Sequence, residues 1–231
     1  MQSSGLLVCG MSREVCPCAP QVRRFARPRL RHRRRDTATN QVMATIPRKM
    51  DLVAITPDGN RAYVTDNTDG NFNLAVIDTG ANTVVTTVPL SESEFTVAVA
   101  TSPDGKYVYA TSLSTIWVVD TGTNMVVARI PARDGFDAGA LAFTPDGKFA
   151  YVVSQRNPAV LVLDTITKTV GPTVTLPGFA NRIAADGKHA YATGDKMIFV
   201  IDTATNAVAA TVPVEGRPFG IAIIPLPPIT R

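Results

Sequence analysis

Short apolar stretches alternate with clusters of Pro, Gly, Asn and Asp along residues 36–231. Val, Ile and Thr supply 64 of the 196 residues in this region, and these β-branched side chains favour strands. No long segment shows the period of about 3.6 residues that is typical of an amphipathic helix. The pattern therefore predicts an all-β domain in which helices are nearly absent.

Three landmarks recur in register along the chain. An Asp-Thr pair returns at spacings of 42, 42, 44 and 38 residues, beginning at Asp36, Asp78, Asp120, Asp164 and Asp202. An Asp-Gly pair begins at Asp58, Asp104, Asp146 and Asp186. A tyrosine stands five residues after each of these four aspartates, at Tyr63, Tyr109, Tyr151 and Tyr191. Landmarks in register over four copies indicate an internal repeat.

Each repeat supplies four candidate strands, which we name A, B, C and D in chain order. In the first full repeat they are Leu52–Thr56, Arg61–Thr65, Asn73–Ile77 and Thr83–Val88. Four short strands in roughly 40–45 residues make up the size of one propeller blade. We predict an all-β β-propeller with about four complete four-stranded blades, one for each full copy of the repeat.

The two ends of the series predict an incomplete fifth blade. One D strand at about Gln41–Ile46 precedes the first full repeat, and one A strand at Gly220–Ile224 follows the last. The B and C strands of this blade are missing, because Arg23–Arg35 is too rich in arginine to serve as a buried strand. We therefore expect single strands of a fifth blade in an open or partial ring. Open blade edges predict self-association, because propellers normally close their sheets.

The repeat resembles the YVTN family of β-propeller repeats. The strings Ile55–Gly59, Ala62–Thr65 and Val76–Thr79 carry the resemblance, which covers residues 36–231. The fourth copy departs from the pattern, with Ala185 where the other copies have Pro. The resemblance implies a bacterial, exported protein of the surface-layer type, located in the periplasm or outside the cell at its surface. It carries over no catalytic residue.

Charge divides the chain into two regions. Residues 1–35 hold nine arginines and a single acid, a net charge of +8, although the formal net charge of the whole chain is only +4. Residues 36–231 carry a net charge of −4. We interpret 1–35 as a basic disordered tail without an evident signal peptide, and 36–231 as the YVTN-type domain. A nucleic-acid partner is not expected, and no apolar run reaches the length of about 18 residues that spans a membrane.

Composition also restricts the chemistry of the domain. Residues 36–231 contain no cysteine and one histidine, His189, which disfavours zinc, haem and histidine-based catalysis. His189 takes the repeat position of Arg61, Tyr107 and Phe149, which indicates an ordinary strand side chain. The segment Asp66–Asn71 is rich in oxygen ligands but lacks the alternating carboxylates and final Glu of an EF-hand loop. We assign no catalytic residue, no metal site and no cofactor.

Antiparallel strands divide the connections between two faces. The A–B and C–D turns form one face, the turn face, and they keep a uniform length and turn chemistry. The B–C and D–A connections form the other, the loop face, and they vary in length. Variable loops on a rigid scaffold are where binding usually occurs. The candidate binding residues on the loop face are Asp51, Asp66, Asp69, Glu92, Glu94, Arg133, Asp134, Arg156, Lys196 and Arg217.

Two functional hypotheses follow. The favoured one is a non-enzymatic β-propeller repeat scaffold that binds a ligand or protein through the loop face, in the periplasm or at the cell surface. The alternative is a propeller enzyme that uses the same face, such as a lactonase-like hydrolase or an electron-transfer subunit. Related propellers host both classes, so the fold by itself does not choose between them.

Overall fold

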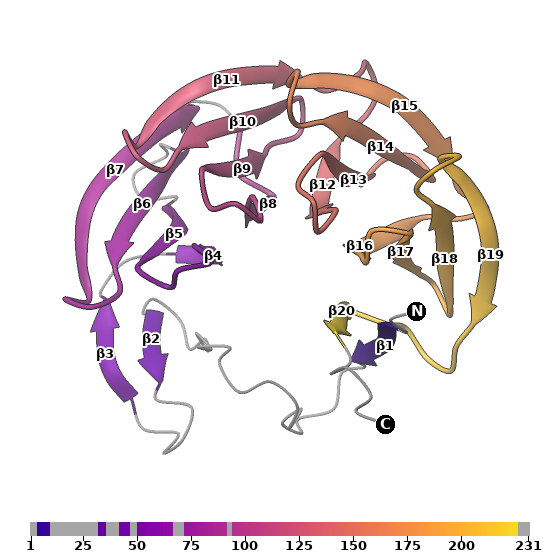
Figure 1. Cartoon of the computed structure of the whole chain (residues 1–231), viewed down its shortest axis with the longest axis horizontal. Coiled ribbons are helices and arrows are strands. Elements are labelled where there is room, and N and C mark those ends of the chain that lie inside the picture. Colours follow the sequence, from indigo (N-terminus) through magenta and orange to yellow (C-terminus); the bar gives the residue numbers. More distant parts are fainter. Residues whose placement is uncertain are drawn as a thin grey trace. The chain divides into compact units, whose positions relative to one another are not determined.

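The computed structural model describes residues 4–9, 32–35, 42–46, 50–66, 72–91 and 94–225, with side chains for 52–66, 72–91 and 94–223. All of the regular elements in these ranges are β-strands (Figure 1). The prediction of an all-β chain is therefore confirmed for the described residues.

Four antiparallel sheets of four strands each make up most of the described chain. The first contains β4 (Met50–Ile55), β5 (Arg61–Asp66), β6 (Phe72–Asp78) and β7 (Thr83–Ser91). The second contains β8 (Ala98–Thr101), β9 (Tyr107–Thr111), β10 (Thr115–Asp120) and β11 (Met125–Pro131). The third contains β12 (Ala138–Phe143), β13 (Phe149–Ser154), β14 (Ala159–Asp164) and β15 (Thr169–Thr175). The fourth contains β16 (Ala180–Ala185), β17 (His189–Gly194), β18 (Met197–Asp202) and β19 (Ala207–Pro213).

The order of strands in each sheet follows the order in the chain, so every sheet is a meander of the A, B, C and D strands. This arrangement is that of a propeller blade, and the predicted partial β-propeller of four complete blades is confirmed. The B and C strands are buried on both faces, as the apolar runs Ala62–Val64 and Val160–Leu163 show. The D strands are much more exposed; β11 alternates exposed and half-buried residues and buries only Ile130, as expected of a strand with one face toward solvent.

The A–B hairpins owe their geometry to the Asp-Gly pair. In the third sheet the Thr144 hydroxyl donates to Asp146 Oδ1 at 2.6 Å, and the Lys148 amide donates to the same oxygen at 3.1 Å. Gly147 then takes a φ of +70°, which costs a side-chain-bearing residue more than it costs glycine. The Asp-Thr turn is tied to this hairpin by a hydrogen bond from the Thr165 hydroxyl to the Gly147 carbonyl.

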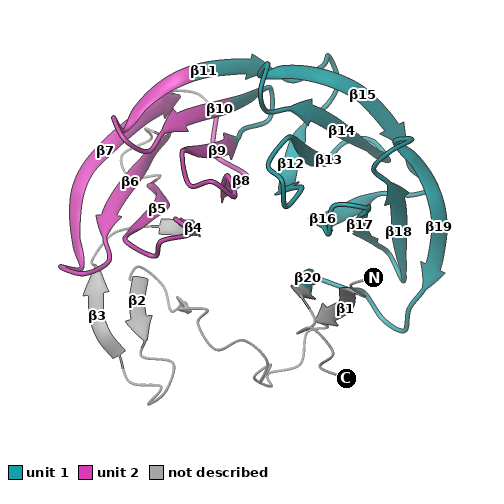
Figure 2. Ribbon diagram, in the orientation of Figure 1, with its two compact units in different colours: residues 1–12, 111–116, 128–231 teal, residues 13–110, 117–127 magenta. Residues whose placement is uncertain are grey.

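Two compact units divide the chain (Figure 2). Unit 1 contains Met1–Ser12, Thr111–Ile116 and Ala128–Arg231, and unit 2 contains Arg13–Ala110 and Trp117–Val127. Residues of the second sheet belong to both units. We describe the two units separately.

In unit 1 the third and fourth sheets pack face to face around one apolar cluster. The third sheet contributes a face that includes Tyr151, Val162 and Val174. The fourth sheet covers it with smaller and aromatic side chains that include Ala190 and Phe199. All of these residues are at most 4% exposed, so this contact between sheets is a dry core.

In unit 2 the equivalent face of the first sheet includes Tyr63, Leu74 and Val76, and it packs against Val108 and Trp117.

A side-chain hydrogen bond accompanies each of these two apolar contacts. The Tyr63 hydroxyl donates to Asn124 Oδ1 at 2.8 Å in unit 2, and the Tyr151 hydroxyl donates to Asn206 Oδ1 at 2.8 Å in unit 1. In both cases the tyrosine lies on a B strand and the asparagine ends the Asp-Thr turn of the next sheet. We call this pair the tyrosine–turn contact.

Two segments of residues 1–35, the region that we expected to be a disordered tail, are strands. Strand β1 (Ser4–Cys9) pairs with β20 (Gly220–Pro225), and β2 (His32–Arg35) pairs with β3 (Val42–Ile46), both antiparallel. We expected no strand in this arginine-rich segment, because a strand buried inside a blade needs apolar side chains. However, β2 is the edge of a two-stranded sheet, where backbone pairing does not require apolar side chains. The other residues of 1–35 lie outside the described ranges.

The expectation of single strands at the two ends is corrected by the same pairs. The last A strand, β20, has β1 beside it in the position of a B strand, and the first D strand, β3, has β2 in the position of a C strand. The two pairs are separate two-stranded sheets. Length and repeat position identified β3 and β20, whereas nothing in the landmark residues marks β1 or β2.

We expect Asp146→Ala to lower the free energy of unfolding by about 0.5–2 kcal/mol, because the Thr144 hydroxyl and the Lys148 amide lose their acceptor. Chemical denaturation of the full chain measures this change. Asp146→Asn is the matched control, because its side-chain oxygen keeps an acceptor in place, and it should lose less. Equal stability of the alanine variant and the wild type would contradict a structural role for this aspartate.

Candidate functional site

The structure brings the B–C and D–A connections of the loop face together in unit 1. The Arg156 guanidinium lies 3.5 Å from the Asp137 carboxylate, and Asn157 Nδ2 donates to the Gly135 carbonyl at 2.5 Å. These contacts join the B–C loop of the third sheet to the D–A loop before it. The assignment of both kinds of loop to one face is therefore correct here.

A second ion pair joins the B–C loop of the fourth sheet to the D–A loop that follows that sheet. Arg217 Nε donates to Asp195 Oδ1 at 2.9 Å, and the Val214 amide donates to the Lys196 carbonyl at 2.9 Å. The side chains of Arg217 and Asp195 are 68% and 63% exposed, so this pair contributes little to stability. It does fix the direction of the Arg217 guanidinium.

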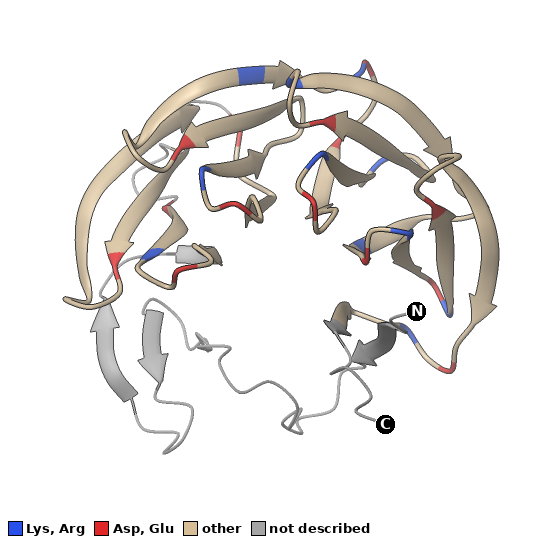
Figure 3. Ribbon diagram, viewed as in Figure 1, with Lys and Arg blue, Asp and Glu red and all other residues tan. Residues whose placement is uncertain are grey.

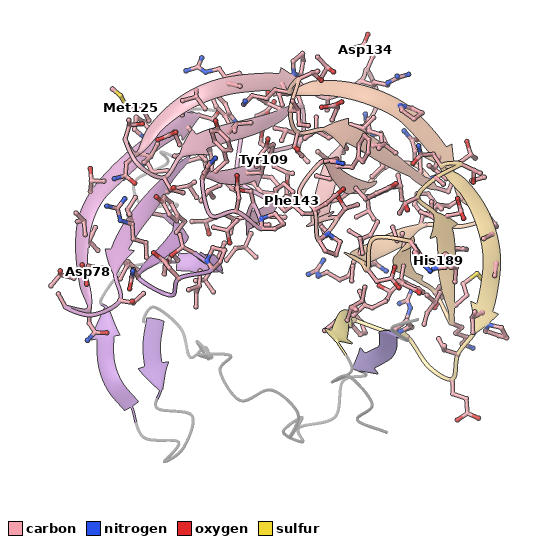
Figure 4. The ribbon with its side chains drawn as sticks, viewed as in Figure 1. Asp78, Tyr109, Met125, Asp134, Phe143 and His189 are labelled. Carbon is pink, nitrogen blue, oxygen red and sulfur yellow. The ribbon has the colours of Figure 1, made fainter. Side chains whose placement is uncertain are left out.

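Two further candidates lie on the D–A loop between the second and third sheets. Arg133 donates from its guanidinium to the Gly171 carbonyl at 2.7 Å. Asp134 is exposed, and its side chain points away from the sheets (Figure 4). Charged residues generally lie in the turns and loops at the ends of the strands, which leaves the strands themselves largely uncharged (Figure 3).

Among the remaining candidates, the structure describes the side chains of Asp66 and Glu94. Asp66 ends β5 and is only 2% exposed, so it is not a surface ligand. Glu94 is half-buried, and its amide donates to Ser91 Oγ at 3.1 Å. Asp69, Glu92 and the side chain of Asp51 lie outside the described residues.

Sequence reasoning missed a group of phenylalanines on the loop face. Phe95, Phe179 and Phe219 precede the A strands β8, β16 and β20 by three residues or fewer and are 49%, 57% and 52% exposed. Phe136 takes the corresponding place in the remaining D–A loop and is only 5% exposed. The signal was available, because an aromatic residue stands within three residues ahead of four of the five A strands, but charge alone was used to choose candidates.

The turn face carries a pocket of about 610 Å³ in unit 2, between turns of the first and second sheets. Its polar lining includes Asp58, Asp78, Asp104 and Arg61. Each of these side chains is already engaged: the aspartates accept hydrogen bonds inside their own turns, and Arg61 donates to the Thr121 carbonyl. The pocket is therefore the seam between two neighbouring turns, built from residues that hold those turns.

Turn hydrogen bonds also set the acidity of the aspartates on this face. The amide of Thr123 donates to Asp120 and holds the pKa of that carboxyl below its usual value of 3.8. The Thr144 hydroxyl, followed by the Lys148 amide, lowers the pKa of Asp146 in the same way. The aspartates whose pKa is lowered mainly by such bonds are Asp58, Asp120, Asp146, Asp164 and Asp202.

His189 is the first residue of β17 and is half-buried, as its repeat position predicts. Its ring centroid lies 6.0 Å from that of Tyr191. The Tyr191 hydroxyl donates to Asp186 Oδ2 at 3.0 Å, and burial followed by this carboxylate raises the pKa of Tyr191 to about 12. These contacts of His189 and Tyr191 lie inside their own blade, as expected of a strand side chain such as His189 rather than a ligand.

Within the described residues, His, Cys, Asp and Glu side chains form no group of three that could hold a metal ion. No helix in the described chain has the length and apolar character needed to cross a membrane.

Comparison with known proteins identifies the class of fold. No family model matches the chain, and no curated protein matches it in sequence. Among solved structures, the chain is similar to Kuenenia stuttgartiensis hydrazine synthase, with a TM-score of 0.62 and 21% sequence identity. The match covers 75% of this chain and 53% of that one, so the chain spans about half the length of its structural neighbour. The likeness shows a β-propeller type of fold and no more.

The lowered pKa values of the turn aspartates predict acid sensitivity. A carboxyl with a lowered pKa in the folded state stabilises the fold above its unfolded pKa, and this stability is lost as the pH falls through the folded value. We therefore expect the free energy of unfolding to decrease from about pH 5 to about pH 2. Denaturant titrations at each pH measure the slope, which should be smaller in Asp120→Asn. A flat profile would contradict the assigned role of these carboxylates.

Proposed function

We propose that this chain is a non-enzymatic β-propeller repeat scaffold of the YVTN type, which binds a protein partner through the loop face of unit 1. The observation that carries the proposal is the pair of exposed phenylalanines, Phe179 and Phe219, together with the oriented guanidinium of Arg217 on the loop of Phe219. Aromatic and arginine side chains contribute most of the binding energy in protein interfaces.

Two structural features support binding at this face rather than at the turn face. The loops end rigid sheets, so their side chains are presented with little loss of entropy on binding. The turn face uses its aspartates and threonines in its own hydrogen bonds, whereas Asp134 and Lys196 on the loop face are exposed. The partner that fits the loop face would present an apolar centre with charges of both signs around it.

The cellular location belongs to the same proposal. The repeat strings of the YVTN type point to an exported bacterial protein, found in the periplasm or at the cell surface. A scaffold that exposes apolar side chains on its loops fits this role, since its partner would cover them.

We expect the double variant Phe179→Ser/Phe219→Ser to lose partner binding. The measurement is capture of proteins on the immobilised full chain from an extract of the cells that make it, with each captured protein quantified. Loss of two aromatic anchors should lower the amount of a specific partner by roughly tenfold or more.

Met125→Ser/Val127→Ser is the matched control, because Met125 and Val127 are 66% and 49% exposed but lie on β11 and not in the loops. This control should capture the partner as the wild type does, and both variants should unfold at the wild-type denaturant concentration. Equal capture by the phenylalanine variant and the wild type would refute the proposed face.

A further inference from the structure

The loop that carries Phe179 is the shortest D–A loop in the part of unit 1 that the structure describes. It has four residues, 176–179, whereas the loops 132–137 and 214–219 have six each. A short connection between strands of adjacent sheets has little freedom in its path, because both of its ends are fixed. Phe179 is the last residue of this loop and directly precedes β16.

Buried contacts hold both ends of the loop. The amide of Leu176 donates to the Pro158 carbonyl at 2.7 Å, and the Leu176 side chain is 3% exposed in the apolar cluster between the third and fourth sheets. At the other end, Ala180 pairs with Gly194 in the ladder of β16 and β17 and is 5% exposed. Only residues 177–179 lie between these two buried positions.

The ring of Phe199 packs against the middle of the loop. Phe199 lies on β18, is fully buried and belongs to the same apolar cluster. A Cβ atom on Gly178 would lie 3.3 Å from Cζ of this ring, which is closer than most Cβ contacts in proteins. Gly178 therefore rests on the ring and leaves little room for a side chain.

The end of β17 is covered still more closely. A Cβ atom on Gly194 would lie 2.8 Å from the Phe179 carbonyl oxygen and 2.8 Å from Cε2 of Phe199, and Cβ atoms essentially never approach so closely. The backbone of Phe179 therefore lies directly against Gly194, and any side chain at that position would displace it.

The third sheet shows what differs beside a longer loop. There Ser154 takes the position of Gly194, opposite the first residue of the A strand. Its side-chain oxygen accepts hydrogen bonds from the Arg156 and Asn157 amides at 3.2 and 3.1 Å. A blade of this chain thus accepts a side chain at the end of its B strand. Glycine is required in the fourth sheet because the four-residue loop lies against that strand.

We propose that Phe199, Gly178 and Gly194 form a platform that fixes Phe179 as the principal anchor of the loop face. The inference rests on the proposed function, because it ranks the two exposed phenylalanines of that face. A side chain whose backbone is fixed before binding loses less conformational entropy when a partner covers it.

The loop of Phe219 has no comparable platform among the described residues. It is two residues longer, and a Cβ atom on the adjacent Gly220 would meet nothing within 4 Å. Phe219 and Phe179 are similarly exposed, at 52% and 57%, so exposure does not separate them. The difference in backbone support is what makes Phe179 the stronger anchor.

Backbone ¹⁵N relaxation of the full chain tests the platform without any partner. We expect Gly178 and Phe179 in the wild type to have order parameters of about 0.85, as in rigid backbone. Gly194→Ala should lower both toward the values below about 0.6 of flexible backbone, because its methyl group displaces the Phe179 carbonyl. Wild-type values below about 0.6 at both residues would overturn the proposal.

Gly220→Ala is the matched control, because it adds the same methyl group beside the other phenylalanine, where it meets no atom within 4 Å. It should leave the order parameters of Gly178 and Phe179 unchanged.

Phe199→Leu tests the platform even where Gly194→Ala does not fold. It removes the ring and leaves the residue that the third sheet has at this position, Leu161. It should lower the order parameter of Gly178, and an unchanged value would overturn the role of the ring.

The capture experiment on the two single variants tests the ranking. Phe179→Ser should lower the amount of captured partner roughly tenfold, and Phe219→Ser only about two- to threefold. Gly194→Ala should lower it as well, although both phenylalanine side chains remain. Equal losses in the two single variants would overturn the ranking.

The same experiment separates failure of this inference from failure of the proposed function. Unchanged capture in Phe179→Ser/Phe219→Ser would overturn the proposed function and the anchor role with it. Lowered capture in that double variant, together with wild-type capture in a folded Gly194→Ala chain, would overturn the platform alone.

Discussion

The fold depends on the packing of the tyrosine-bearing face of one sheet on the facing side of the next. In unit 1 this contact buries Tyr151, Val162 and Val174 against Ala190 and Phe199. Each fully buried aliphatic or aromatic side chain contributes about 1.5–3 kcal/mol, whereas a hydrogen bond such as that from Tyr151 to Asn206 contributes about 0.5–1.5 kcal/mol. The apolar contact therefore supplies most of the stability, and the hydrogen bond sets the register of one blade on the next.

This constraint explains why the turn face and the loop face differ so much in how far their sequences can vary. On the turn face, the threonine of the Asp-Thr turn donates to the glycine carbonyl of the Asp-Gly hairpin in each full copy, as with Thr79 to Gly59 and Thr203 to Gly187. The bond fixes the two turns relative to each other, so their length and residue types are restricted. On the loop face a main-chain bond recurs from Ala132 to Ser114, from Leu176 to Pro158 and from Val214 to Lys196. Because it uses backbone groups, it does not restrict residue type, which leaves side chains such as those of Phe179 and Lys196 available for binding.

The sequence predicted the features of the fold that are local to one repeat. The Asp-Gly landmark gives the turn type directly, because the amide two residues after the aspartate donates to its side chain in all four copies. The sequence did not predict the β1–β20 and β2–β3 pairs, since pairing by an edge strand depends on backbone groups that every residue has.

The loop face of the candidate site was predicted from the variable length of its loops. The ion pair between Arg156 and Asp137 was not predicted, because the sequence does not give the distance between their two loops. The burial of Asp66 could not be predicted either, because an aspartate is usually exposed.

The departures in the last repeat show that the repeated proline serves the neighbouring blade more than its own hairpin. A Cβ on Gly105 would lie 3.2 Å from Cδ of Pro57, and one on Gly187 would lie 3.5 Å from Cδ of Pro145, so each proline packs on the glycine of another hairpin. Ala185 replaces this proline in the fourth copy, yet the hairpin still forms around Asp186, which accepts hydrogen bonds from the Lys188 and His189 amides. The hairpin of the fourth copy therefore forms without the proline.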